Sequence, residues 1–241
     1  MNRGRTAKEP RTMKFKSPIL SEASGSVAGL TASHNRYGMY FRQRVIPVNP
    51  ATGLQVSIRG IFGNLSTAWQ DSLTQTQRDA WELYASNVTL TDSLGNQVNV
   101  TGANMFIRCN TPRLQVGLPQ VDDGPTEFSL GAFTQVGGVL SGSGDSYTVV
   151  FDNTDDWANE DGGGLLFYFG RPQAPTINFF KGPYRYGGIV LGDAVTAPTS
   201  PAALTPLPWT YTSDQAGFIR CVASRADGRL SPTQRIRTIV T

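Results

Sequence analysis

The stretch that decides the fold runs from residue 27 to residue 110, and its most informative pieces are VAGLTASHNRYGMYFRQRVIPVNP (27–50), LSTAWQDSLTQTQRDAWELYASNV (65–88) and VTGANMFIRCN (100–110). The first piece contains two strand-compatible runs, 27–34 and 39–46, on either side of an Asn-Arg-Tyr-Gly sequence with turn chemistry. The other two pieces carry helix signals. A basic segment precedes this stretch, and a long segment rich in Gly, Pro and aromatic residues follows it.

The second run of the predicted hairpin alternates two kinds of side chain. Met39 and Phe41 alternate with Tyr40 and Arg42, so that one face carries arginines beside a tyrosine. Such a β surface is typical of contact with a partner or with water. We predict inter-subunit contacts at Arg36, Tyr37, Tyr40, Arg42 and Arg44. An ordinary solvated strand face is the alternative interpretation.

Asn49-Pro50 predicts the start of a first helix, with an Asx cap and Pro at the first helical position. One apolar stripe of this helix recurs at helical spacing, at Ile58, Phe62, Leu65 and Trp69. Three glycines, Gly53, Gly60 and Gly63, weaken the helix by up to about 1 kcal/mol each relative to Ala. Their presence predicts that something packs closely against this backbone.

Two further helices have cap signals. Thr74 and Gln77 form a capping box that predicts the start of a second helix. Trp81 and Tyr84 are predicted to lie on the inner face of this helix. Thr101 caps a third short helix. Its inward-facing residues are Phe106 and Cys109, and a Leu94-Gly95-Asn96 turn between two short strands separates it from the second helix.

The chain after residue 110 has a different composition. Residues 111–126 contain three prolines and predict an extended linker, and we place the domain boundary near 118–126. The remainder predicts about seven short strands, typical of an antiparallel sandwich. These are 138–141, 146–151, 165–169, 188–191, 209–212, 217–224 and 234–240, the last two joined by a turn with Asp227-Gly228.

The predicted fold class is therefore α+β, with an immunoglobulin- or fibronectin-like sandwich in the C-terminal half. The predicted division is a basic extended arm (1–26), a hairpin with a helical anchor (27–118), a linker (119–126) and the sandwich (127–241). Residues 171–187 predict a long aromatic loop, and such loops often bind partners. The candidate contacts in it are Phe179, Phe180, Tyr184 and Tyr186.

The charge of the chain is unevenly distributed. Residues 1–44 hold nine Lys/Arg against Glu9 and Glu22, a net charge of +7. The whole chain has a net charge of +3, so the other 197 residues have a net charge of −4. A basic arm on a mildly acidic body can pair with nucleic acid or with the acidic face of a neighbouring copy. A solvated tail is the third interpretation.

The sequence contains no arrangement that predicts an enzyme, a cofactor site or a metal site. The single histidine, His34, has no Cys or His partner at metal-ligand spacing. The acidic run 152–161 is a candidate Ca²⁺ loop, but it lacks the expected ligand ladder, and a solvated loop is the preferred interpretation. No apolar run predicts a membrane helix or a signal peptide, so that the two cysteines, Cys109 and Cys221, are expected to be free and buried.

Several motifs resemble an uncharacterised group of proteins encoded by tailed bacteriophages and prophages. They are NRYGMYFRQRVIPVNP (35–50), LS-x-AW (65–69), LT-x-x-QR-x-AW-x-x-YA (73–85), VTG-x-x-MFIR-x-N (100–110) and S-x-ADGRLSP (224–232). The resemblance implies a virion component assembled in the cytoplasm of the bacterial host. It transfers no catalytic residue to this chain.

The expectation from sequence is a non-enzymatic virion structural protein at the capsid, the neck or the tail. It would assemble with copies of itself and with other virion proteins through its N-terminal arm. Two alternatives remain open. One is nucleic-acid binding through residues 1–26, and the other is a carbohydrate- or receptor-binding module in the C-terminal half.

Overall fold

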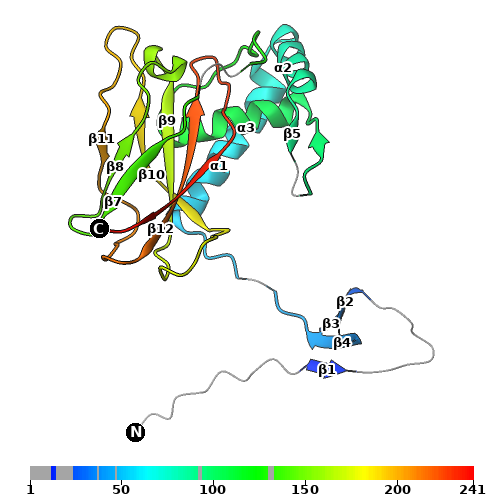
Figure 1. Ribbon diagram of the computed structural model, residues 1–241. Coiled ribbons are helices and arrows are strands. Elements are labelled where there is room, and N and C mark those ends of the chain that lie inside the picture. The colour runs from blue at the N-terminus through cyan, green and yellow to red at the C-terminus, as the bar shows by residue number, and fades with distance from the viewer. Residues whose placement is uncertain (1–11, 15–23, 37, 47, 92–93, 130–132) are drawn as a thin grey trace. The chain divides into compact units, whose positions relative to one another are not determined.

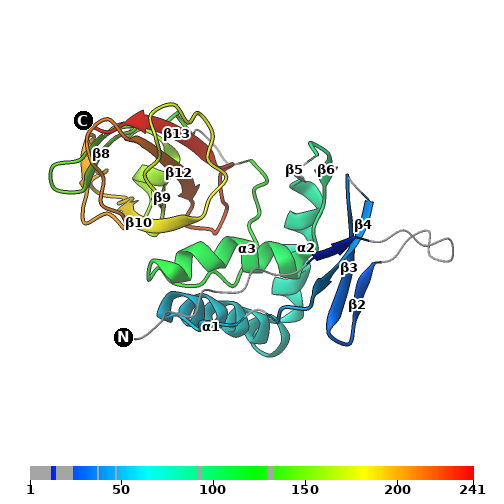
Figure 2. The same ribbon diagram turned by 90° about the horizontal axis from the view of Figure 1, so that it is seen from below.

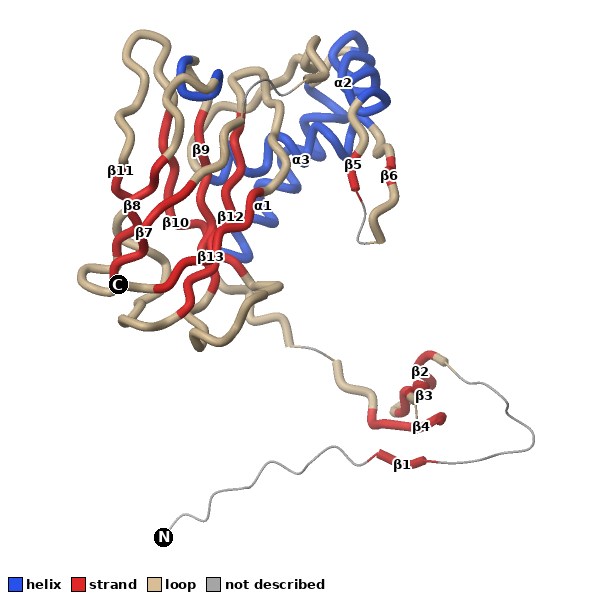
Figure 3. The backbone as a smooth tube through the Cα atoms, viewed as in Figure 1, coloured by secondary structure: helices blue, strands red, loops and turns tan. Residues whose placement is uncertain are grey.

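A computed structural model describes residues 12–14, 24–36, 38–46, 48–91, 94–129 and 133–241. The chain divides into two compact units, Met1–Thr52 and Gly53–Thr241, which we call the N-terminal unit and the body. Helices and several antiparallel sheets are both present, which confirms the α+β class (Figure 3).

The N-terminal unit contains one four-stranded antiparallel sheet in the order β1-β4-β3-β2 (Figure 1). Its strands are β1 (Thr12–Lys14), β2 (Gly25–Val27), β3 (Leu30–Asn35) and β4 (Gly38–Gln43). The predicted hairpin is β3 and β4, paired from Leu30↔Gln43 to Asn35↔Gly38. The sequence did not predict β1, which lies within the segment expected to be an extended arm and pairs with β4.

The helical part of the body consists of α1 (Gly53–Thr67), a π-helical turn η1 (Ala68–Ser72), α2 (Gln75–Asn87) and α3 (Gly102–Gln115). A small hairpin of β5 (Leu90–Thr91) and β6 (Gln97–Val98) joins α2 to α3. Both predicted caps are confirmed: Thr74 and Gln77 form a capping box, and the Thr101 hydroxyl accepts the Asn104 N–H. The buried apolar residues of this part are Leu65, Leu73, Trp81, Tyr84, Ala85, Met105, Phe106 and Cys109.

Two helix boundaries differ from the sequence-based expectation. The first helix begins at Gly53 and not at Pro50, because Ala51 has a left-handed backbone (φ 44°) and the Asn49 side chain accepts the Ala51 N–H at 3.3 Å. The third helix continues through Pro112 to Gln115, where an extended segment was expected from residue 111. A proline so near the helix end removes one hydrogen bond, and the buried Arg113 that follows it anchors the last turn.

The segment expected to be a linker lies against the helical part. Val121 exchanges hydrogen bonds with the Asn110 side chain, at 2.7 and 3.0 Å, and the Trp81 indole donates to the Asp122 carbonyl at 2.9 Å. A Cβ at Gly124 would lie 2.6 Å from the backbone of Ala80 and Trp81. This segment therefore passes in close contact with α2.

The strand-rich part of the body contains two antiparallel sheets, in the orders β10-β9-β12-β13 and β11-β8-β7. Their bounds are β7 (Gly137–Ser141), β8 (Ser146–Val150), β9 (Gly164–Gly170), β10 (Tyr184–Leu191), β11 (Ala202–Leu204), β12 (Ala216–Ser224) and β13 (Gln234–Ile239). A short 3-10 turn, η2 (Asp156–Asn159), precedes β9.

Six of the seven strands predicted after residue 127 are confirmed, and one is wrong. Residues 209–212 form a loop, because the Tyr211 N–H donates to the Asp145 carboxylate and its hydroxyl to the Gly170 carbonyl. The sequence did not predict β11, whose three residues give too short an apolar pattern to detect. Strand β10 begins at Tyr184, so Tyr184 and Tyr186 lie on a strand and not in the loop that was expected.

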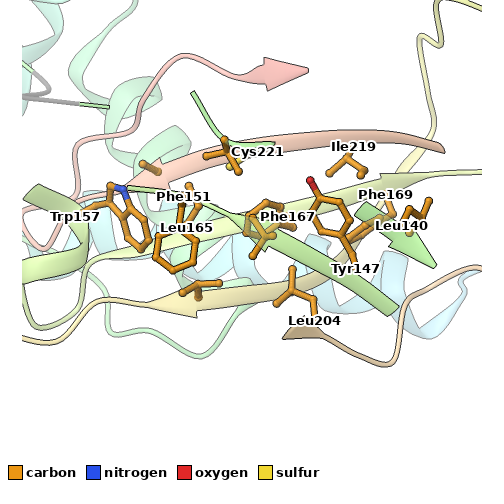
Figure 4. Close-up of a cluster of buried hydrophobic side chains, with 14 of the residues drawn as sticks. Leu140, Tyr147, Phe151, Trp157, Leu165, Phe167, Phe169, Leu204, Ile219 and Cys221 are labelled. Carbon is orange, nitrogen blue, oxygen red and sulfur yellow. The ribbon is translucent and has the colours of Figure 1, made fainter. Parts of the chain in front are cut away.

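The two sheets enclose one apolar core (Figure 4). Alternate residues of β9, Leu165, Phe167 and Phe169, point into it, with Ile219 and Cys221 of β12 beside them. Tyr147 crosses Phe169 edge to face at 5.6 Å between ring centroids. Strand β13 lies beside β7 and β10 beside β11, so that the strands form an almost closed ring (Figure 2).

Candidate functional site

The N-terminal sheet has one apolar and one polar face. Directly paired residues share a face of an antiparallel sheet, so the pairs Ala32↔Phe41 and His34↔Met39 lie on one side, with Leu30 two residues before Ala32. Tyr40 and Arg42, paired with Ser33 and Thr31, lie on the other side. The sheet is therefore amphipathic.

The structure brings together some of the predicted hairpin contacts. Tyr40 and Arg42 share a face, as the alternation predicted, and Arg42 is exposed. Arg36 lies in the turn, and Arg44 follows the end of β4, where its backbone N–H donates to the Gly29 carbonyl at 2.8 Å. Tyr37 lies outside the described residues. These residues border the sheet without forming one cluster.

Residues 24–52, as far as their side chains are described, include no buried side chain. The connection between β4 and the body contains some of the most exposed apolar residues of the chain, with Val48 89% exposed. Val45 and Ile46 are each about three-quarters exposed, at 74% and 77%. Apolar surface of this density is characteristic of a segment that a partner covers.

Helix α1 is also incompletely covered. Leu65 and Trp69 of the predicted stripe pack in the helical core, whereas Ile58 is partly exposed outside it and Phe62 is 54% exposed. A Cβ built at Gly60 or at Gly63 would meet nothing within 4 Å, and the same holds for Gly53. The close packing predicted at these glycines therefore does not come from the described part of this chain, and packing by a partner stays a prediction.

An apolar groove of about 440 Å³ lies along α3. Ile107 and Pro112 of α3 form one wall, and Phe62 of α1 forms another. Tyr168 and Val222, from the outer face of the β9–β12 sheet, form its floor. The sequence did not predict this groove, because its walls come from four elements that are distant along the chain.

The aromatic residues predicted as partner contacts at residues 171–187 are mostly engaged within the body. Phe180 packs on Tyr184 and Phe218, with ring centroids 5.4 and 5.7 Å away, and Tyr186 packs on Tyr168 at 5.9 Å. Only Phe179 of this set is strongly exposed, at 65%. These rings form an edge-to-face cluster rather than a flat platform.

Arginines accompany this aromatic cluster. The guanidinium of Arg185 lies 4.0 Å from the ring centroid of Trp209, and that of Arg220 lies 4.1 Å from that of Tyr184. Arg237 donates to the carbonyls of Ile177 and Pro175, which holds the loop against β13. The alternating QRIRTI pattern of β13 could have indicated two arginines on one face of a strand.

The carboxylates of Asp152 and Asp155 in the acidic run 152–161 accept hydrogen bonds from the chain itself. Asp152 accepts the Thr154 N–H at 2.9 Å and its hydroxyl at 2.7 Å, and these bonds hold the pKa of Asp152 below its usual value. Asp155 is buried and accepts from the backbone and side chain of Thr134. No group of three potential metal ligands occurs in the described ranges.

A buried arginine connects the helical part to the strand-rich part. Arg113 Nη1 donates to the Arg225 carbonyl at 2.7 Å, the Gly162 carbonyl at 3.0 Å and the Ser224 hydroxyl at 3.1 Å. Its Nε donates to the Pro119 carbonyl at 3.2 Å, and burial lowers the pKa of the guanidinium. This role of Arg113 could not be predicted from the sequence, in which Arg113 is only a charged residue near the end of a helix.

The 224–232 hairpin also contacts both parts of the body. Arg225 forms a bidentate ion pair with Glu160, at 2.7 and 3.2 Å, and Leu230 packs on the helical core. A Cβ at Gly228 would lie 3.5 Å from the Trp81 ring. The 224–232 hairpin therefore joins the two parts of the body.

Both cysteines and several tyrosines of the body are buried. Cys109 and Cys221 are free and buried, as predicted, and burial raises the pKa of both thiols, that of Cys109 to about 12. Burial also raises the pKa of Tyr84, Tyr147 and Tyr211. No helix in the described part of the chain is long and apolar enough to cross a membrane.

Comparison with protein families, with curated proteins and with solved structures found no match to this chain.

Proposed function

We propose that this chain is a non-enzymatic structural protein of a tailed-bacteriophage particle, which assembles with neighbouring subunits through its N-terminal unit. The observation that carries the proposal is the amphipathic N-terminal sheet. A small sheet needs an apolar face packed against something to be stable. Among the described side chains, the apolar side with Leu30, Ala32 and Met39 has no buried residue, and Leu30 is 51% exposed. An adjoining subunit would provide its cover.

Two features of the body support assembly as well. Phe62 and the groove along α3 present apolar surface, and the glycines of α1 would let another backbone approach closely. Covering such surfaces in a particle stabilises the contact through the hydrophobic effect, about 25 cal/mol per Å² buried. Each subunit would thus complete its packing only in the assembly.

The assignment to a phage particle depends on the resemblance of the motifs at residues 35–50, 65–85, 100–110 and 224–232. On this proposal the protein is a virion component that is assembled in the bacterial cytoplasm. The finer description of the strand-rich part as immunoglobulin- or fibronectin-like belongs to this proposal too. It is supported by the antiparallel division into four and three strands around one core.

The other functions considered from sequence have less support. Residues 1–11, the most basic part of the arm, lie outside the described residues, so nucleic-acid binding through them stays a prediction. A carbohydrate site would require exposed aromatic faces, whereas Phe180, Tyr184 and Tyr186 pack on one another or on neighbouring rings.

The test is incorporation into particles. Quantitative mass spectrometry of purified particles should detect the protein. We expect on the order of six to twelve copies per particle for a ring component and on the order of hundreds for a shell component. A variant lacking residues 1–25 should remain folded and be absent from particles. Normal incorporation of this variant, or absence of the complete chain from particles, would overturn the proposal.

A further inference from the structure

One face of the strand-rich part concentrates positive charge. The loop 171–183 contains two cations and no acidic residue, and it lies against β10, β12 and β13, which add four arginines. Within the described ranges, none of the six forms an ion pair with a carboxylate. Four of them lie on the loop or on the outer face of the sheet, and we call these the basic surface: Lys181, Arg220, Arg235 and Arg237. Arg185 is paired with the core residue Phe169 and lies on the other face, beside Trp209.

The cations of the basic surface are held in place before any partner arrives. Arg220 stacks on Tyr184, and its Nη2 donates to the Lys181 carbonyl at 3.2 Å. Arg237 donates to the carbonyls of Ile177 and Pro175. Arg220 Nε is buried without a hydrogen-bond partner in the described structure. Fixed side chains lose less conformational entropy on binding than free ones, so the surface is suited to receive an anionic partner.

The opposite end of β9 is acidic. Residues 152–161 contain five Asp/Glu and no Lys/Arg, and Asp193 joins them because its N–H donates to the Ala158 carbonyl at 3.1 Å. Asp161 and Asp193 are exposed, and the Asp156 side chain is 49% exposed. Arg225 neutralises part of this charge through Glu160 and Asp156. We call this set the acidic end.

The two charged regions are far enough apart to act separately. Strand β9 leads from Gly164, beside the acidic end, to Gly170, beside the basic surface. Seven residues of strand span roughly 20 Å, well beyond the screening length of about 8 Å at physiological ionic strength. The charges therefore cannot satisfy each other within one copy, but they can do so between copies.

We propose that the basic surface binds the acidic end of a second copy of this chain, so that copies associate head to tail. This inference rests on the proposed structural function and deepens it by naming the partner and both contact surfaces. A head-to-tail contact joins two different surfaces, and it generates a ring if the rotation closes and a filament if it does not. The exposed Phe179 and Ile177 beside the arginines supply apolar area at the centre of the contact.

The test is a charge exchange in the complete chain. One variant, Lys181→Glu with Arg235→Glu, reverses the basic surface at two side chains that donate no hydrogen bond in the described structure. The other, Asp156→Lys with Asp161→Lys, reverses the acidic end. Sedimentation velocity at low salt should show self-association of each variant weakened roughly tenfold or more, since two attractive pairs become repulsive.

An equimolar mixture of the two variants should associate as strongly as the wild-type chain. In the mixture each reversed surface meets a reversed partner, and each native surface meets a native one. The N-terminal unit is identical in every preparation, so its contribution is constant. The control is Asp71→Lys, which changes charge by the same amount per site on the helical part and should leave association unchanged.

Circular dichroism melting verifies folding, and the single substitutions Arg235→Glu and Asp156→Lys replace any double variant that does not fold. Failure of the mixture to recover, or a wild-type chain that is monomeric at low salt, overturns the inference. Loss of polyanion binding in the first variant without loss of self-association would assign the surface to nucleic acid instead. Particle incorporation decides the proposed function separately, because it is measured with the unmodified chain.

Discussion

Arg113 illustrates how a single side chain holds two parts of the body together. Its donors reach the carbonyls of Pro119, Gly162 and Arg225, which belong to three different segments. A buried cation loses its hydration, and hydrogen bonds to carbonyls replace only part of that loss. The cost is tolerated because the carbonyls would otherwise be buried without donors.

Replacing Arg113 by methionine should lower the free energy of unfolding by roughly 3 kcal/mol or more, because several buried acceptors lose their donor at once. Urea denaturation of the purified chain measures this change. The matched control is Arg185→Met, which removes an exposed guanidinium from a ring and should cost at most about 1 kcal/mol. Equal effects of the two substitutions would contradict a special role for Arg113.

The buried thiols predict sensitivity to alkali. Burial raises the pKa of Cys109 from 9.0 to about 12, so the folded chain keeps a proton that the unfolded chain releases above pH 9. This contribution to stability is fully present below pH 9 and is lost as the pH rises toward 12, at about 1.4 kcal/mol per pH unit. Buried tyrosines act in the same direction at higher pH.

Cys109→Ala should therefore reduce the fall in unfolding free energy between pH 9 and pH 10.5 by about 2 kcal/mol. Denaturant titrations at the two pH values give the difference. Met105→Leu changes a buried neighbour that does not titrate, and its pH dependence should match that of the wild-type chain. If both variants show the wild-type slope, the Cys109 thiol titrates as an exposed one does.

At the scale of elements, α1 is the helix that the chain itself explains least. Its core-facing residues are Ile61 and Leu65, while a Cβ at Gly60 or Gly63 would meet no described atom within 4 Å. Glycine lowers helix stability without any compensating contact in this chain. The compensation we infer is a neighbouring subunit that packs on this side.

Gly60→Ala and Gly63→Ala should each raise the free energy of unfolding of the isolated chain by about 0.5–1 kcal/mol and should reduce incorporation into particles. The control is Gly124→Ala, whose Cβ would lie 2.6 Å from the Ala80 backbone, so it should destabilise the chain. Stabilised alanine variants that incorporate normally would show that this side of α1 stays uncovered.

At the scale of the whole molecule, the two units contribute differently to stability. Both apolar cores, the one around Trp81 and the one around Phe167, lie in the body. The N-terminal unit contributes paired strands and exposed apolar surface, with no buried side chain in its described residues 24–52. In the proposed function, the body is the folded platform and the N-terminal unit offers the surface for assembly.

Deleting residues 1–52 should leave the free energy of unfolding of the body unchanged, because the deletion removes no described buried side chain. Denaturation followed by tryptophan fluorescence measures this, since Trp69, Trp81, Trp157 and Trp209 all lie in the body. A matched destabilised reference is Leu65→Ala in the same truncated chain, which should lose about 2–5 kcal/mol. A large loss on truncation alone would show that the N-terminal unit stabilises the body.

The sequence by itself determined the elements whose causes are local. Thr74 with Gln77 and Thr101 fixed helix starts, the Asn35–Gly38 turn fixed the β3–β4 hairpin, and Asp227-Gly228 fixed the turn after β12. Alternation of apolar and polar residues located most of the strands, because side chains of a half-buried strand must alternate between core and solvent. Burial of the two cysteines also followed from the sequence.

Only the tertiary structure decided the features made by residues distant along the chain. The Arg113 junction joins residues up to 112 positions apart, and the groove along α3 and the opposed charges at the two ends of β9 come from several elements each. The first helix also begins later than the sequence predicted, at Gly53, because Ala51 takes a left-handed conformation. Contacts between distant residues depend on how elements pack, and no local pattern records that packing.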